Sequence, residues 1–185
     1  MCWYLLLQIL RGFFSRKLKL KVLKVQTQKS VENIYGRSVR FNVFATDDKG
    51  KLYNIEVQRA DSGAVPIRAR YNASMLDYHN TKMAERYSDL LETFVIFITE
   101  HDVLKWGQPK YHVERVERKK GNETFGNGSH IIYVDGSYKD NSGSELGDLM
   151  QDFFCANPKE MRHKKIAERV TYIKEDRREV KKCAK

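Results

Sequence analysis

The sequence predicts an α/β fold in which a mixed central sheet is flanked by helices. Residues 93–99 form a continuous apolar, β-branched and aromatic run, typical of a central strand buried on both faces. Residues 38–45 and 52–59 alternate as two strands around a turn at 47–50. A helix follows them. The expected order is therefore α-β-β-β-α-β, followed by a small β extension and C-terminal helices.

The chain is long enough for one domain with a sizeable core, and we expect a single domain over residues 1–185. Its 41% hydrophobic and 11% aromatic content favours a folded protein over a disordered one. The net charge of +10 favours an anionic partner such as nucleic acid or an acidic membrane surface. A soluble protein that is merely basic is the alternative.

The apolar start, residues 1–10, is too short to span a bilayer and lacks the basic region and cleavage site of a signal peptide. We expect a shortened core helix within residues 1–16, with a membrane-interface anchor as the less favoured alternative. Cys2, Cys155 and Cys183 are widely spaced and form no CxxC pattern, which fits a reducing compartment. The expectations are a cytoplasmic location and no membrane association.

The remaining elements follow from periodicity and turn residues. Leucine and valine alternate with lysine over 17–22, which predicts a half-buried strand that is followed by 25–27. A connector is expected over 30–36. Residues 64–78 read as a helix that tolerates Pro66 in its first turn. Two short strands, 111–116 and 130–134, form the expected β extension around a loop at 121–128. A basic helical region is expected over 140–185, with helices at 144–154 and 158–178.

The hairpin gathers polar side chains on one face of the sheet. Strand alternation places Asn54, Glu56 and Gln58 together. A three-residue loop with Gly50 in the left-handed conformation would place Asn42 directly opposite Glu56. Two oxygen-bearing side chains would then lie within reach of one metal ion. A solvated sheet surface is the ordinary alternative.

Other groupings of chemically active residues carry less information. The five histidines, at 79, 101, 112, 130 and 163, show no HxxxH or HExxH spacing, so a zinc site is not expected. His130 is expected to open a strand. Asp47 and Asp48 could bind a cation, but acids in a hairpin turn usually accept hydrogen bonds from the turn backbone. No GxSxG motif or Walker-type loop occurs.

Two helices carry candidate contacts to nucleic acid. In the last helix acidic residues are interspersed among the basic ones, so phosphate contact and a solvated face with helical ion pairs remain equal alternatives. The candidate residues on the two helices are Arg68, Arg70, Tyr71, Lys164, Lys165 and Arg169.

Several stretches together carry a family resemblance. Residues 32–37, 38–46 and 53–59 closely resemble the PD-(D/E)xK nuclease family transposases, the recombination-promoting (Rpn-like) nuclease group. Further matches are 68–71, 92–99 and 128–134, and the resemblance covers roughly residues 18–175. It implies a restriction-endonuclease-like core, DNA as partner and no small-molecule cofactor.

The resemblance also implies Mg²⁺-dependent hydrolysis of DNA phosphodiester bonds. Members have a metal-binding Asp and Glu at the positions of Asn42 and Glu56, and Gln58 stands where the third motif residue orients the attacking water. A glutamine can hydrogen-bond a water but is no general base at neutral pH. Asn42 removes one negative charge, so weaker metal affinity is expected. The two leading hypotheses are a DNA endonuclease and a catalytically inactive DNA-binding remnant. A protein-interaction module using Phe13 and Phe14 is a third.

Overall fold

A computed structural model describes residues 22–33, 36–138 and 144–183 of the chain. The chain divides into two compact units, one of residues 20–138 and one of residues 1–19 with 139–185. Each unit is described by itself. The helix expected over 1–16 and the Phe13–Phe14 docking surface lie outside the described residues. The expectation of one domain over 1–185 stays a prediction.

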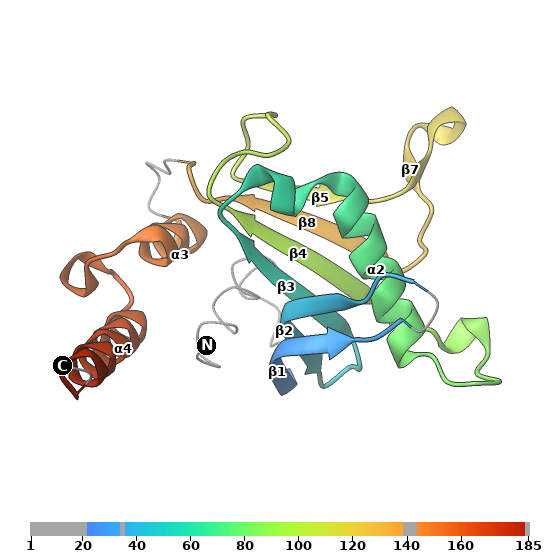
Figure 1. Ribbon diagram of the computed structural model, residues 1–185. Helices are drawn as coiled ribbons and strands as arrows, with labels where there is room; N and C mark the ends of the chain where they lie inside the picture. Colours follow the sequence, from blue (N-terminus) through green and yellow to red (C-terminus); the bar gives the residue numbers. More distant parts are fainter. Residues whose placement is uncertain (1–21, 34–35, 139–143, 184–185) are drawn as a thin grey trace. The chain divides into compact units, whose positions relative to one another are not determined.

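A six-stranded mixed sheet forms the centre of the first unit (Figure 1). The strand order is β1-β2-β3-β4-β8-β5. The first three strands are antiparallel neighbours, β3, β4 and β8 run parallel, and β5 closes the sheet antiparallel to β8. The bounds are β1 Val22–Val31, β2 Val39–Asp47, β3 Leu52–Gln58, β4 Thr93–Thr99, β5 Lys110–Val113 and β8 Ser129–Asp135. The predicted mixed α/β architecture is confirmed.

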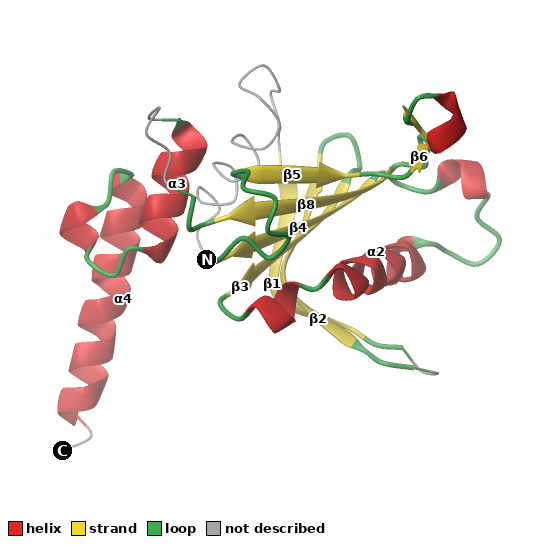
Figure 2. Cartoon of the chain, turned by 90° about the horizontal axis from the view of Figure 1, so that it is seen from above, coloured by secondary structure: helices red, strands yellow, loops and turns green. Residues whose placement is uncertain are grey.

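Helix α2, Pro66–Asn80, packs on one face of this sheet (Figure 2). Pro66 lies in the first turn, where its missing N–H leaves no hydrogen bond broken. Ala69, Ala73 and Leu76 are buried and join a core with Val95 of β4. The small alanines bring the helix close to the sheet, and this fixes the height of its polar residues above the strands.

Strand β4 is the centre of the sheet, as predicted. Every residue from Thr93 to Thr99 is buried, because strands lie on both sides of it and side chains cover both faces. Its parallel registers with β3 and β8 place Glu56 level with Phe97, and Phe97 level with Tyr133. Pairing with β4 therefore fixes the positions of residues along both β3 and β8.

The predicted β extension was placed wrongly. Segments 110–113 and 129–135 are strands of the main sheet, because the run Ile132, Tyr133, Val134 is apolar and buried beside β4. A smaller two-stranded sheet does occur, but it consists of β6, Val116–Glu117, and β7, Glu123–Thr124. The segment predicted as loop 121–128 contains β7. Strand β1 continues to Val31, two residues into the expected connector, and residues 17–21 lie outside the described part.

The C-terminal unit contains α3, Glu145–Phe154, and α4, Lys164–Cys183. Ser144 caps α3 by accepting a hydrogen bond from the backbone N–H of Gly147. The second helix begins at 164 and not at 158 as predicted. Asp152, only 1% exposed, accepts the backbone N–H groups of Arg162 and His163 and ends the connector there. Among the described residues, no helix is both long and apolar enough to cross a membrane.

Three 3-10 helices complete the part of the first unit that the structure describes, and a fourth precedes α4. The first leads from β3 toward α2 and carries the glycine that matters for the site below. Their bounds are η1 Asp61–Ala64, η2 Tyr87–Asp89, η3 Arg118–Lys120 and η4 Pro158–Glu160.

Candidate active site

The β2–β3 hairpin has the register expected from its turn. Gly50 adopts a φ of +79°, and the backbone N–H of Asp47 donates to the Lys51 carbonyl. The paired residues run from Thr46 with Leu52 to Val43 with Ile55. The next step along both strands places Asn42 opposite Glu56. There the backbone pairing gives way to a side chain, because Oε1 of Glu56 accepts the Asn42 N–H at 3.2 Å.

Glu56 is the centre of the candidate site. Its side chain is 0% exposed, which overturns the solvated-surface reading of this face. Oε2 accepts a hydrogen bond from Nε2 of Gln58 at 3.3 Å and lies 3.6 Å from Nη2 of Arg68. Burial raises the pKa of the carboxyl above its ordinary value of 4.5. The Asn42 N–H, the Arg68 charge and the neighbouring amides oppose that rise.

Asn42 lies beside this carboxylate, as predicted. Its side chain is half-buried, and Nδ2 donates to the carbonyl of Val57 at 3.3 Å. This hydrogen bond anchors the carboxamide to β3, where pairing between the two strands ends. Asn42 is therefore held by its backbone N–H against the Glu56 side chain and by its carboxamide against the Val57 carbonyl.

Asn54 is a site residue that the sequence reasoning placed on this face but gave no role. It is 0% exposed, and its carboxamide lies close enough to Glu56 to lower the pKa of that carboxyl. Neither of its polar side-chain atoms reaches a partner with hydrogen-bond geometry. Such an orphaned amide inside a protein is costly. Strand alternation was the signal that could have identified it.

Gln58 is positioned by a glycine on η1. A Cβ added to Gly63 would lie 2.3 Å from Oε1 of Gln58, so the glutamine amide occupies the space that any side chain would need. The carbonyl of Gly63 accepts a hydrogen bond from Nη1 of Arg68 at 2.9 Å. The same guanidinium thus contacts Gly63 and Glu56, and it joins α2 to the site.

The predicted nucleic-acid residues are divided between the two units, on α2 and α4. On α2, Arg68 belongs to the Glu56 site, Arg70 is exposed, and the Tyr71 hydroxyl donates to the carbonyl of Arg37. Tyr71 therefore has a clear structural role. Lys164 and Lys165 are exposed on α4 of the other unit. Arg169 also lies within that helix.

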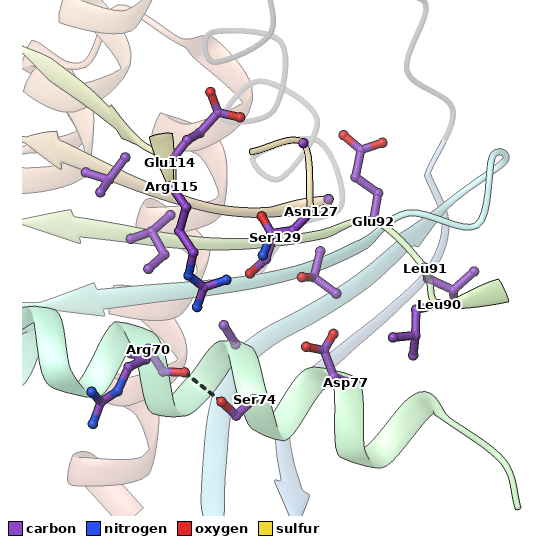
Figure 3. Close-up of a pocket in the computed structure, with 16 residues that line it drawn as sticks. Arg70, Ser74, Asp77, Leu90, Leu91, Glu92, Glu114, Arg115, Asn127 and Ser129 are labelled. Carbon is purple, nitrogen blue, oxygen red and sulfur yellow. Dashed lines mark hydrogen bonds between the residues drawn. The ribbon is translucent and has the colours of Figure 1, made fainter. Parts of the chain in front are cut away.

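A separate cleft with a volume of about 610 Å³ lies along the other end of α2 (Figure 3). Arg70, Ser74 and Asp77 contribute from the helix, and Glu92 and Arg115 from the loops beside the sheet. Burial raises the pKa of Asp77, and the Arg115 charge opposes that rise. Asn42, Glu56 and Gln58 do not line this cleft. It was not predicted, because its walls come from segments far apart in the sequence.

Asp47 has a structural explanation. Its carboxylate accepts the backbone N–H groups of Lys49 and Lys51, each at 2.9 Å, and the hydroxyl of Tyr53 at 2.9 Å. The turn therefore uses its buried acid as the ordinary reading predicted. A cation at this carboxylate would have to displace these donors.

The fold indicates a class of protein. A six-stranded mixed sheet with α2 packed on one face is consistent with the restriction-endonuclease-like fold of the PD-(D/E)XK nucleases. A sequence model of the PD-(D/E)XK nuclease family transposases matches residues 4–140, well over half of the chain. The chain belongs to this family, whose nucleases generally use divalent metal ions. A search of curated proteins found no significant match.

Proposed function

We propose that this chain is a metal-dependent DNA endonuclease of the transposase type with a weakened cation site at Asn42 and Glu56. The observation that carries the proposal is the fully buried Glu56 carboxylate, which contacts Asn42, Gln58 and Arg68. A buried carboxylate with a raised pKa among convergent polar groups is a typical feature of functional sites.

The donor set fits a divalent cation of the hard, oxygen-binding kind. Mg²⁺ is usually bound by one or two carboxylates together with substrate phosphates, so Glu56 and a DNA phosphate can supply the charged oxygens. Amide oxygens of Asn42 and of the orphaned Asn54 are neutral donors of the same chemical type. When bound, the cation supplies polarisation of the phosphoryl oxygen and a lower pKa for bound water.

The residues of the chain divide the remaining work. Glu56 provides the buried carboxylate of the site, and Gln58 orients a water through its amide without taking its proton. Arg68 neutralises Glu56 in the free protein and has a second contact to Gly63 that keeps it in place. A phosphate oxygen entering the site is an alternative partner for the same guanidinium.

DNA binding rests on the charge of the chain and on exposed basic residues. The net charge is +10, and Arg70 and Lys164 are exposed on two different helices. Contacts of this kind bind phosphates without reading base sequence. The proposal therefore predicts salt-sensitive binding with little sequence preference.

Plasmid nicking tests the hydrolytic function. Purified chain is incubated with supercoiled plasmid and Mg²⁺ or Mn²⁺, alongside the variants Glu56→Gln and Asn42→Asp. Slow nicking by the parent and none by Glu56→Gln is the expected result. Asn42→Asp should nick about tenfold faster or more, since the number of charged ligands tunes cation affinity. Nicking that survives Glu56→Gln contradicts the assignment.

A second candidate is a DNA-binding protein of the same fold without turnover. The Arg68 guanidinium favours it, because a permanent cation already lies 3.6 Å from Oε2 of Glu56. This candidate predicts binding of DNA by the parent in gel-shift assays, no cleavage, and cleavage regained in Asn42→Asp. An inert Asn42→Asp variant that still binds DNA would show that the missing ligand is not the sole defect.

A further inference from the structure

Two histidines and a glutamate converge at the β5–β8 edge of the sheet. His112 lies on β5, Glu114 follows that strand, and His130 lies on β8. Nδ1 of His130 is 3.1 Å from Nε2 of His112 and 2.9 Å from Oε1 of Glu114. Nε2 of His112 is 3.9 Å from the same Oε1. Three ligand-type atoms therefore face one another around one point.

These separations match those of metal ligands. Tetrahedral ligands at about 2.0–2.1 Å from Zn²⁺ lie about 3.3 Å apart. The three observed separations, 2.9, 3.1 and 3.9 Å, bracket that value. An imidazole nitrogen that carries no proton is an acceptor, and a single cation would satisfy two such nitrogens and the carboxylate oxygen together.

A second carboxylate fixes the ring of His130. Its other nitrogen, Nε2, lies 3.1 Å from Oε1 of Glu92, and the ring stacks on Phe94 with centroids 4.6 Å apart. Lys51 holds Glu92 through an ion pair of 2.5 Å. In the neutral tautomer that donates Nε2–H to Glu92, Nδ1 carries a lone pair directed at Glu114. A carboxylate bonded to the outer nitrogen of a histidine is the usual support of a metal-binding imidazole.

We propose that His112, Glu114 and His130 form a binding site for Zn²⁺ or a similar divalent transition metal. Imidazole nitrogens with one carboxylate are borderline ligands suited to this class of ion and not to Mg²⁺. The His112 side chain is 43% exposed, so the fourth position of the metal is open to water. A metal here would tie the edge strand β5 to β8.

This site is distinct from the Glu56 site. The strand registers place His130 level with Phe94 and Phe94 level with Tyr53, three residues before Glu56 on β3. An odd offset along a strand places side chains on opposite faces of the sheet. The inference therefore does not rest on the proposed nuclease function.

The sequence pattern explains why the site was not predicted. His112 and Glu114 are two residues apart, a spacing that shares a face on an extended chain, whereas the motifs considered require helical spacing. His130 joins them because β5 and β8 are antiparallel neighbours, with Val113 opposite Ile131. The expectation of no zinc site rested on the absence of HxxxH and HExxH spacings, and the present proposal departs from it.

Zinc titration of the full-length chain, with any affinity tag removed, tests the proposal. Affinity is measured by competition with a chromophoric chelator, and Co²⁺ absorption reports the coordination geometry. The parent should bind one Zn²⁺. His112→Ala and Glu114→Gln should each weaken binding about 100-fold or more, and Glu92→Gln about tenfold, since loss of supporting partners alone costs 10–100-fold. His101→Ala, at an exposed histidine outside the cluster, should leave binding unchanged.

The controls separate this site from the other one. Glu56→Gln should leave Zn²⁺ affinity unchanged, whatever it does to plasmid nicking. Circular dichroism melts show whether each variant folds, and His112→Gln replaces His112→Ala if the latter does not. Equal Zn²⁺ affinity in the parent, His112→Ala and Glu114→Gln would overturn the proposal. So would a parent that binds Zn²⁺ no more tightly than Mg²⁺.

Discussion

The guanidinium of Arg68 lies 3.6 Å from Oε2 of Glu56. This contact joins α2 to the carboxylate on β3. The acid is 0% exposed, while the arginine side chain is 40% exposed. The free protein thus presents a carboxylate that is already partly neutralised and an arginine that solvent can reach. Under the proposed function, an incoming metal or DNA phosphate has to change this pair, so the first prediction concerns its charge.

Glu56→Gln should change how stability depends on pH. Burial raises the folded-state pKa of Glu56 above its unfolded value, so the folded chain binds this proton more tightly. Its contribution to the free energy of unfolding is full below the unfolded pKa and is lost as pH rises through the folded pKa. Glu56→Gln has no carboxyl at this position and does not undergo this loss. The melting temperature of the variant minus that of the parent should therefore increase between about pH 4 and neutral pH in the presence of EDTA.

Asp48→Asn is the matched control for that experiment, since Asp48 is an exposed acid in the adjacent turn. Its melting temperature should follow the parent at every pH. A pH profile for Glu56→Gln that is parallel to the parent's would mean that the carboxyl titrates normally and is not buried as described.

Gly63→Ala should destabilise the chain by forcing Gln58 from its place. The new Cβ would lie 2.3 Å from Oε1 of Gln58, so the free energy of unfolding should fall by about 1–3 kcal/mol. Urea denaturation measures the change. In a Gln58→Ala background the obstructing amide is gone, and the cost of Gly63→Ala should become small. Equal costs in the two backgrounds would refute the close approach.

Asp47→Ala should weaken the hairpin that carries the site. It removes the acceptor of two backbone N–H groups and of the Tyr53 hydroxyl, which should lower the unfolding free energy by about 1–3 kcal/mol. Asp48→Ala, in the same turn but exposed, should stay within about 0.5 kcal/mol of the parent. If the two variants lose the same stability in chemical denaturation, then Asp47 is not the anchor of the turn.

The salt dependence of DNA binding should reveal which helix binds phosphate. Removing a basic side chain that neutralises one phosphate reduces the slope of log K against log salt by about 1. Arg70→Ala tests α2, and the double variant Lys164→Ala/Lys165→Ala tests α4. Lys49→Ala, an exposed lysine of the hairpin turn, is the charge-matched control for Arg70→Ala. Fluorescence anisotropy with a short duplex gives the slopes. Parent-like slopes in both helix variants would exclude both surfaces as phosphate-binding sites.

Local patterns predicted most of the sheet correctly. The apolar run of β4 and the turn at Gly50 each depend on short stretches of sequence, and both appear as expected. The strands β5 and β8 were found but assigned to an extension. Their place beside β4 depends on pairing between distant segments, which periodicity does not encode. The start of α4 was misplaced for a similar reason, because Asp152 ends the connector from ten residues away.

The sequence predicted which residues form the candidate site better than it predicted their burial and contacts. The register placed Asn42 and Glu56 together because turn length alone fixes it. Complete burial of Glu56 and its contact with Arg68 depend on how α2 packs against the sheet. The close approach of Gly63 depends on the path of η1. The His112 cluster combines residues from β5, from the segment after β5 and from β8, so no single stretch of sequence predicted it.

The Glu56 site is built from one uninterrupted stretch of chain, from Asn42 on β2 to Arg68 on α2. One short segment of the gene therefore encodes the whole site. A single short exchange with a related gene could replace the complete set of polar groups together with the turn and the glycine that position them. Under the proposed function, Asn42→Asp alone would place a second carboxylate in a scaffold that already holds Glu56.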